Sequence, residues 1–369
     1  MDITTLVFLA LGLVLLVAGA ELLVKGASGL AISAGISPLV VGLTVVAFGT
    51  SAPELAVSAS AGLRGQGDIA LGNVVGSNIA NVLLILGVSA LVAPLVVSRQ
   101  LVRLDVPIMI GASVLLLLVG LDGVVSRVDG VLLVAGIVAY TTAMIRIGRR
   151  DAAATAAQAR AAALADGEEL IPEPARGWVA QVALVLAGLA LLVLGSRWLV
   201  NGAVAIATLL GVSQLVIGLT VVAVGTSLPE IATSILATLR GARDLAVGNV
   251  VGSNIYNILA ILGISAAIAP DGIPVAPAAL GFDVPVMIAV AVACLPVAFN
   301  GYMIARWEGA LFLGYYLAYT LYVILAATEH DALPYFSGAM MLFVIPLTVV
   351  TLAVVTYRAF VRQRSASAA

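Results

Sequence analysis

Two glutamates of this 369-residue chain stand inside long apolar segments, where a carboxylate is unusual. Glu54 ends the segment GLTVVAFGTSAPE, and Glu230 ends its near-copy GLTVVAVGTSLPE. If these segments cross a membrane, an ionised side chain near the bilayer centre is costly, and residues of this kind usually mark an ion path. The two glutamates therefore predict a cation site in the interior of the molecule.

A proline stands directly before each glutamate, at Pro53 and Pro229. Because proline lacks an N–H group and clashes with the preceding turn, each should break or kink its helix. Such a break is expected to free backbone carbonyls, which are tolerated at membrane depth only inside the protein or along a cavity. The carbonyls concerned are those of Ala47, Thr50, Ala223 and Thr226.

A second motif, GNVVGSNIAN, ends at Asn81 and recurs as GNVVGSNIYN, which ends at Asn257. Ser77 and Asn81 share one face of a helix because they are four residues apart. The same holds for Ser253 and Asn257. The glycines of the motif favour close helix packing, and a serine inside a span more often bonds its own helix than a ligand.

Taken together, the two motifs offer carboxylates, carbonyls, hydroxyls and amide oxygens. Such a cage contains only oxygen ligands and carries two negative charges, which suits hard cations, Ca²⁺ above all. Na⁺ binds the same kind of oxygen. The motifs offer no soft ligand for copper or zinc.

The composition places these motifs in a membrane protein. Hydrophobic residues make up 62% of the chain and charged residues 10%, and the mean hydropathy is +1.20. In a soluble protein, roughly a quarter of all residues are charged. Apolar stretches of about 20 residues recur, each long enough to cross a ~30 Å hydrocarbon layer. These values exclude a soluble enzyme, a nucleic-acid binder and a disordered chain, and the continuous runs argue against an outer-membrane barrel.

The sequence offers few residues that could bind a cofactor or catalyse a reaction. The chain has one cysteine, Cys294, and one histidine, His330, so neither a disulfide framework nor a cysteine cluster can form within it. Neither residue is placed to serve a serine nucleophile. We predict that the protein is not an enzyme and has no cofactor. With a net charge of −2, we expect the bilayer and the transported ions as its partners, and no nucleic acid or protein.

Ten spans are expected in the core. The start of the chain lacks the basic residues and cleavage site of a signal peptide, so its apolar run is interpreted as a retained first span. An eleventh run covers residues 335–358, and the polar stretch 149–176 is expected to be a loop with some surface helix. The ten spans cover about 4–33, 37–63, 69–97, 104–121, 128–147, 178–208, 213–239, 245–269, 280–299 and 306–327.

The chain matches itself after a shift of 176 residues. Between Gly42–Gly87 and Gly218–Gly263, 32 of 46 positions are identical. Each copy holds five spans, and an odd number forces the second copy to enter the membrane from the opposite side. Two inverted five-helix repeats of this kind are typical of secondary transporters. The predicted units are a first repeat at 1–147, a central loop at 148–177, a second repeat at 178–327 and an extra helix with a basic tail at 328–369.

Basic residues set the predicted orientation, because cytoplasmic loops carry an excess of lysine and arginine. The central loop is rich in arginine, so we place it in the cytoplasm and the N-terminus outside. The loop at 329–331 then lies outside, and the C-terminal tail lies inside. Arg64 is the exception to this count. The predicted location is the inner membrane of a prokaryote.

One other pair of charges lies in the first span. Glu21 and Lys25 are four residues apart, so we expect them to pair on one face of the helix. Their counterparts in the second repeat are Arg197 and Asn201, so the pair is not repeated.

The paired motifs resemble the two alpha repeats of the cation/calcium exchanger superfamily, and most closely those of prokaryotic sodium/calcium exchangers. The resemblance covers about residues 1–327. It implies ten spans in two inverted halves, with a sliding gate formed by the first and sixth spans. Many relatives carry aspartate where this chain has Asn257, which leaves the charge of the central position and any coupling to K⁺ open.

The resemblance also implies which residues hold which ion. Ca²⁺ would bind Glu54, Glu230 and the carbonyls of Thr50 and Thr226. The implied Na⁺ sites share the glutamates and add Ser51, Ser77, Ser227, Ser253 and the carbonyls of Ala47 and Ala223. Asn81 and Asn257 would line the central position.

The predicted function is a secondary antiporter that exchanges Ca²⁺ for Na⁺ by alternating access around the two glutamates. Exchange of Ca²⁺, or of another divalent cation, for H⁺ is the alternative, because protonated glutamates could replace Na⁺. An ion channel is disfavoured, since inverted halves around a midplane site usually serve alternating access.

Overall fold

Helices form nearly all of the computed structural model, which describes residues 3–166, 178–212, 214–217, 220–221, 223–299, 302–354 and 357. In these ranges eight helices are long and apolar enough to cross a membrane, and a bent pair, Pro38–Thr50 with Ala52–Leu63, makes a ninth. Two shorter apolar helices, Leu228–Leu239 and Ala279–Leu295, occupy the two other predicted positions. The prediction of an all-α polytopic membrane protein is confirmed.

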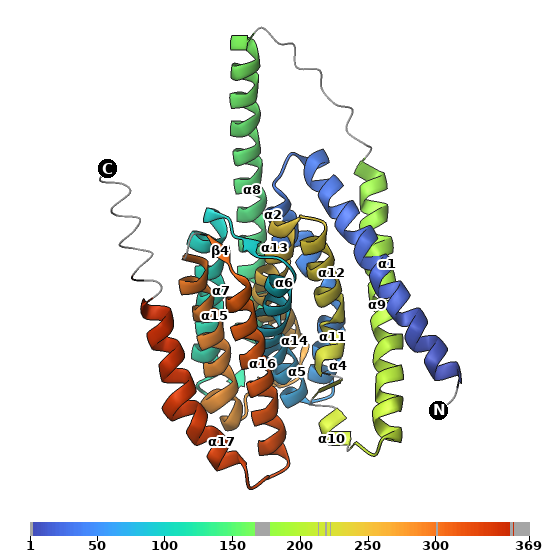
Figure 1. Cartoon of the computed structure of the whole chain (residues 1–369), viewed down its shortest axis with the longest axis vertical. Helices are drawn as coiled ribbons and strands as arrows, with labels where there is room; N and C mark the ends of the chain where they lie inside the picture. Colours follow the sequence, from blue (N-terminus) through green and yellow to red (C-terminus); the bar gives the residue numbers. More distant parts are fainter. Residues whose placement is uncertain are drawn as a thin grey trace.

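The elements follow the same order in both halves (Figure 1). The first half contains α1 (Ile3–Ala34), α2 (Pro38–Val41), α3 (Ala47–Thr50), α4 (Ala52–Leu63), α5 (Gly67–Ala80), α6 (Gly87–Val92), α7 (Val106–Val119) and α8 (Arg127–Asp166). The second contains α9 (Trp178–Leu209), α10 (Gln214–Ile217), α11 (Ala223–Thr226), α12 (Leu228–Leu239), α13 (Arg243–Tyr256), α14 (Gly263–Ile268), α15 (Val284–Phe299) and α16 (Arg306–Ala327). The helix α17 (Leu333–Ala339) opens the last span.

Four two-residue strands tie the halves together. They are β1 (Leu95–Val96), β2 (Val124–Val125), β3 (Ile273–Pro274) and β4 (Met303–Ile304). β1 pairs with β4, and β2 pairs with β3, both antiparallel. Each pair therefore joins the first strand of one half to the second strand of the other. This exchange is what a two-fold relation between the repeats requires.

The predicted helix breaks are present in both repeats. Ser51 leaves the helical conformation with φ −82° and ψ 9°, and α3 and α4 are bent by 48° there. Ser227 has φ −86° and ψ 6° between α11 and α12. A proline follows each break as the second residue of the next helix, where its missing N–H costs no hydrogen bond.

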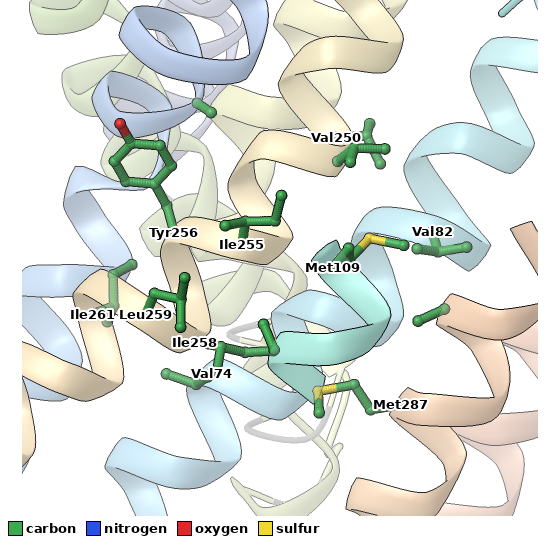
Figure 2. Close-up of a cluster of buried hydrophobic side chains, with 14 of the residues drawn as sticks. Val74, Val82, Met109, Val250, Ile255, Tyr256, Ile258, Leu259, Ile261 and Met287 are labelled. Carbon is green, nitrogen blue, oxygen red and sulfur yellow. The ribbon is translucent and has the colours of Figure 1, made fainter. Parts of the chain in front are cut away.

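The two central helices carry the second motif. Over an apolar stretch of 18 residues, 78% of the residues are buried in the span that contains α5 and 83% in the span that contains α13. The corresponding share for α16 is 6%. Figure 2 shows side chains of these two helices, among them Val74 and Ile255, in a buried cluster with Met109 of α7 and Met287 of α15. The core of the protein is thus built around the motifs that carry polar side chains.

Helices α1 and α9 lie side by side at one edge of the molecule (Figure 1). Their contact is lined by glycines at seven-residue spacing, Gly12, Gly19 and Gly26 on α1 and Gly188, Gly195 and Gly202 on α9. A Cβ atom on Gly19 would lie 2.8 Å from the carbonyl oxygen of Gly188, and one on Gly195 would lie 2.7 Å from that of Gly12. The two backbones are therefore in direct contact, as small residues allow between helices in a bilayer.

The expected pairing of Glu21 with Lys25 is wrong. Instead, Nη2 of Arg240, at the end of α12, lies 2.6 Å from both carboxylate oxygens of Glu21. Helix packing brings this arginine to Glu21 from 219 residues away, a contact that the local spacing does not reveal. The equivalent residues of the other half are Arg197 and Arg64, two like charges, so this ion pair has no counterpart.

Helix α8 continues beyond residue 147, where the span was expected to end, to Asp166. Its last part is rich in alanine, the residue with the highest helix propensity. In Figure 1 this part projects past the ends of the neighbouring helices. The rest of the predicted central loop lies outside the described residues. The last span, Leu333–Val354, contacts the core through a 2.7 Å hydrogen bond between the hydroxyls of Tyr315 and Thr348.

The arginine distribution and the odd number of spans per repeat predict the orientation of two loops. In a Cys294→Ala background, single cysteines at Ala156 and Asp331 should react with a membrane-impermeant thiol reagent from opposite sides, Ala156 from the cytoplasmic side. The cysteine-free parent is the control and should not be labelled. Labelling of both positions from one side would contradict the inverted arrangement.

The glycine contact between α1 and α9 predicts a strong position dependence of glycine substitutions. In Gly188→Ala the new Cβ would lie 2.6 Å from the backbone nitrogen of Leu23, so the helices must separate. We expect a loss of about 1–3 kcal/mol in stability, measured as a lower thermal unfolding midpoint in detergent. Gly111→Ala on α7 is the control, because no atom lies within 4 Å of its Cβ position and helix propensity favours alanine. Equal midpoints for the two variants would contradict the direct contact.

Candidate cation site

Glu54 and Glu230 are both buried, with 1% of their surface exposed. Each lies in the first turn of a helix that starts at a break, Glu54 in α4 and Glu230 in α12. The free N–H groups and the positive end of the helix dipole stabilise a carboxylate at such a position. The breaks therefore do more than bend the spans, because they place a helix N-terminus beside each glutamate in the interior.

The serines before the prolines contact the glutamate of the opposite repeat. The hydroxyl of Ser51 donates to Oε1 of Glu230 at 2.9 Å, and that of Ser227 donates to Oε1 of Glu54 at 3.3 Å. The two carboxylates are close enough to repel each other. One site thus contains both glutamates, and each repeat supplies the hydroxyl that holds the carboxylate of the other.

The second carboxylate oxygens are open. Oε2 of Glu54 and Oε2 of Glu230 are buried and have no hydrogen-bond partner among the described residues. Neither glutamate forms an ion pair with a basic side chain in the part of the chain that the structure covers. A buried charge without a partner is strongly destabilising. This arrangement favours a cation between the two carboxylates.

Threonines and asparagines surround the carboxylates. Thr50 lies beside Glu230, and Thr226 lies beside Glu54. The hydroxyl of Thr50 donates to the amide oxygen of Asn249 at 3.1 Å. Within the first repeat, Nδ2 of Asn73 donates to the backbone carbonyl of Glu54 at 3.1 Å. The first asparagine of each GNVVGSN motif therefore supports the helix breaks.

The last asparagine of each motif presents a free oxygen. Nδ2 of Asn81 donates to Oδ1 of Asn254, and Nδ2 of Asn257 donates to Oδ1 of Asn78, both at 2.9 Å. Oδ1 of Asn81 and Oδ1 of Asn257 are buried without a hydrogen-bond partner in the described structure. Both residues begin a π-helical turn, η2 (Asn81–Leu86) and η5 (Asn257–Leu262), a distortion often found at functional sites.

The motif serines and the carbonyls differ in whether they already have a hydrogen-bond partner. Ser77 and Ser253 are buried, and the hydroxyl of Ser253 has no partner among the described residues. The carbonyl of Ala47 is not released by the break as expected, because it accepts the N–H of Ser51 at 3.1 Å. In the second repeat the N–H of Ser227 donates to the carbonyl of Val224 at 3.1 Å, one residue beyond Ala223.

Four asparagines that support the site were not predicted from the sequence: Asn73, Asn249, Asn78 and Asn254. Their signal was present, since all four stand at identical positions of the two repeats. Within the second motif, ligand roles were expected only for Ser77 and Asn81, which share a helix face, and for Ser253 and Asn257, which share another. Hydrogen bonds between the repeats, such as that of Asn257 to Asn78, cannot be read from spacing within one helix.

Taken as chemistry, the site offers oxygen atoms only and carries two carboxylates. No group of three or more histidine, cysteine, aspartate or glutamate side chains is suited to a metal within the ranges that the structure describes. An oxygen cage of this charge fits a hard cation that enters and leaves, and it offers none of the thiolates or imidazoles that transition metals prefer.

Comparisons with known proteins point to transport. A family model described as "Sodium/calcium exchanger protein" matches residues 4–146 and 180–325. The chain is 42% identical over 316 residues to the "Putative antiporter CaxA" of Alkalimonas amylolytica, covering 85% of this chain and 96% of that protein. It is 35% identical over 343 residues to the sodium/calcium exchanger MaX1 of Methanosarcina acetivorans, with coverage of 85% and 96%.

A solved structure shares the fold. The sodium-calcium exchanger NCX_Mj, soaked with Na⁺ and Ca²⁺, superposes with a TM-score of 0.72 at 31% sequence identity. The match covers 89% of this chain and 99% of NCX_Mj.

Proposed function

The chain belongs to the sodium/calcium exchanger family, and on that premise we propose that it exchanges Ca²⁺ for Na⁺ by alternating access around Glu54 and Glu230. The observation that carries the proposal is the pair of buried carboxylates, each held by a serine of the other repeat and each with one open oxygen. One Ca²⁺ balances their two charges. The proposed setting is a prokaryotic inner membrane, with the N-terminus outside.

The same electrostatics explains why transport is exchange. Without a cation the two buried carboxylates repel each other, and no basic side chain pairs with either one in the described structure. Moving this site through an occluded state while it is empty is costly. Na⁺ ions must therefore replace Ca²⁺ before the site can return, which couples the two flows. A midplane site between inverted repeats is suited to this cycle.

The proposed ligands are those that the resemblance to the exchanger family implies. Ca²⁺ binds Glu54 and Glu230 with the carbonyls of Thr50 and Thr226, the residues that directly precede the two breaks. Na⁺ sites share the glutamates and use Ser51, Ser227, Ser77, Ser253 and the carbonyls of Ala47 and Ala223. Because a carbonyl oxygen has two lone pairs, that of Ala47 can bind an ion while it accepts the N–H of Ser51. Asn81 and Asn257 contribute their open oxygens at the centre.

Exchange of Ca²⁺ for H⁺ is the second candidate, because two protons on the glutamates would also neutralise the site. The serine hydroxyls at both carboxylates favour Na⁺, since they add neutral oxygen ligands that a proton does not need. The discriminating experiment is ⁴⁵Ca²⁺ uptake into proteoliposomes that contain the purified protein. An outward Na⁺ gradient at equal pH should drive uptake, and a pH gradient without Na⁺ should not.

Controls for this experiment are liposomes without protein and proteoliposomes treated with a Na⁺ ionophore, which should abolish the uptake. Uptake driven by the pH gradient alone would replace the Na⁺ proposal by H⁺ exchange. Ca²⁺ flux that follows its own gradient without any counter-ion would contradict an antiporter altogether.

Removing either carboxylate charge should abolish exchange. Glu54→Gln and Glu230→Gln each leave one charge to hold Ca²⁺, a loss of about 3 kcal/mol, or roughly a hundredfold in affinity. Folding should be preserved or improved, because a costly buried charge is gone. Na⁺-driven ⁴⁵Ca²⁺ uptake and the thermal unfolding midpoint measure the two effects.

The matched control is Glu329→Gln, the same change in an exposed turn between α16 and α17. It should leave both uptake and stability at the level of the parent. Parent-like uptake by a well-folded Glu54→Gln or Glu230→Gln variant would show that the two glutamates are not the site.

A further inference from the structure

Two methionines contact the asparagine network behind the proposed site. The Sδ atom of Met109 on α7 lies 3.3 Å from Nδ2 of Asn254, and Sδ of Met287 on α15 lies 3.5 Å from Nδ2 of Asn78. Both methionines are buried, with 0% and 2% of their surface exposed. They hold equivalent places in the two repeats, each two residues after the proline of an Asp-Val-Pro segment. Figure 2 shows both side chains within the buried cluster.

The sulfur of methionine can only accept a hydrogen bond. An asparagine amide has a donating end and an accepting end, and its orientation is set by its neighbours. Because Sδ of Met109 lies against Asn254, the NH₂ end of that amide must face the sulfur. The Oδ1 end of Asn254 then accepts Nδ2 of Asn81 at 2.9 Å. The orientation of one amide therefore determines the orientation of the next.

The same chain exists in the other direction. The NH₂ group of Asn78 faces Sδ of Met287 and the backbone carbonyl of Asn254 at 3.3 Å. Its Oδ1 accepts Nδ2 of Asn257 at 2.9 Å. In both chains the terminal amide oxygen, on Asn81 or Asn257, is the atom left buried without a partner among the described residues. If either chain reversed, an NH₂ group would take the place of that oxygen and would repel a cation.

We infer that Met109 is a positioning residue, which orients the amide of Asn254 so that Asn81 offers its oxygen to the cation. The inference rests on the proposed function. The two methionines are not equivalent in it. Asn78 keeps a second acceptor, the carbonyl of Asn254, when Met287 is replaced, whereas Met109 is the acceptor that holds the NH₂ group of Asn254.

A purely structural role makes a different prediction. Methionine is a common filler of buried apolar space, and leucine replaces it with little loss of stability when volume is conserved. If the two side chains only fill the cluster of Figure 2, then leucine should leave ion binding unchanged at both positions. Leucine removes the acceptor and keeps the apolar bulk, so Met→Leu separates the two roles.

The experiment compares Met109→Leu and Met287→Leu in proteoliposomes, with Na⁺-driven ⁴⁵Ca²⁺ uptake measured over a range of Ca²⁺ concentrations. For Met109→Leu we expect the half-saturating concentration to rise about five- to tenfold, the size of effect that losing one hydrogen-bond acceptor produces. Met287→Leu, the matched control, should shift it by less than about twofold, because the backbone acceptor remains. Both thermal midpoints should stay close to that of the parent.

A double-mutant cycle with Asn81→Ala links the methionine to its proposed target. Once the Asn81 amide is gone, Met109→Leu should no longer change the half-saturating concentration, which a merely structural role would not produce. If Met109→Leu does not fold, Met109→Ile takes its place in the same measurements.

Two results would overturn the inference while leaving the proposed function intact. In the first, the parent exchanges Ca²⁺ and Met109→Leu has the same half-saturating Ca²⁺ concentration as the parent. In the second, both methionine variants shift this concentration equally, and the shifts persist in the Asn81→Ala background. A parent that takes up no Ca²⁺ under a Na⁺ gradient would instead contradict the proposed function itself.

Discussion

Much of this structure serves to stabilise two carboxylates in an interior where the described residues offer them no basic partner. Glu54 and Glu230 are buried and unpaired with basic groups in the described residues, and charges in such a place need local stabilisation. The chain supplies it by ending a helix at Ser51 and at Ser227, so that a new helix starts beside each glutamate. It also supplies a hydroxyl to each from the opposite repeat.

The packing around the site follows from the same requirement. Polar groups buried this deeply must be hydrogen-bonded or serve a ligand, and the spans that contain α5 and α13 carry most of them together with the two broken spans. Asn249, which is fully buried, binds Ser234 of its own repeat and Thr50 of the other repeat. Asn73 binds Ser58, the counterpart of Ser234, and the backbone carbonyl of Glu54. The peripheral spans have few buried residues, 6% over an 18-residue stretch of α16 and 0% over that of Leu333–Val354. The polar centre and the apolar periphery reverse the usual order of a soluble protein.

Spans, breaks and the repeat could be predicted from the sequence, because each leaves a local signal: an apolar run, a proline, or a match after a fixed shift. Contacts between segments far apart in the chain left no such signal. Glu21 was assigned to Lys25 because they are neighbours on one helix, whereas packing brings Arg240 to it. No role was predicted for Asn78 and Asn254, because their hydrogen bonds form only where the two halves meet. The alanine-rich end of α8 was taken mostly for loop because its polar composition outweighed its helix propensity.

The crossed contacts between the halves also bear on how the protein is made. Ser227 follows Glu54 by 173 residues, so at about 5–20 residues per second the glutamate is synthesised roughly 10–35 s before its hydroxyl partner. Until the second half is made, β2 likewise has no β3 to pair with, and the glycine face of α1 has no α9 to cover it. A nascent first half therefore waits in the bilayer with its carboxylate and its close-packing surface unmatched. Membrane insertion of the second half completes the folding of the first.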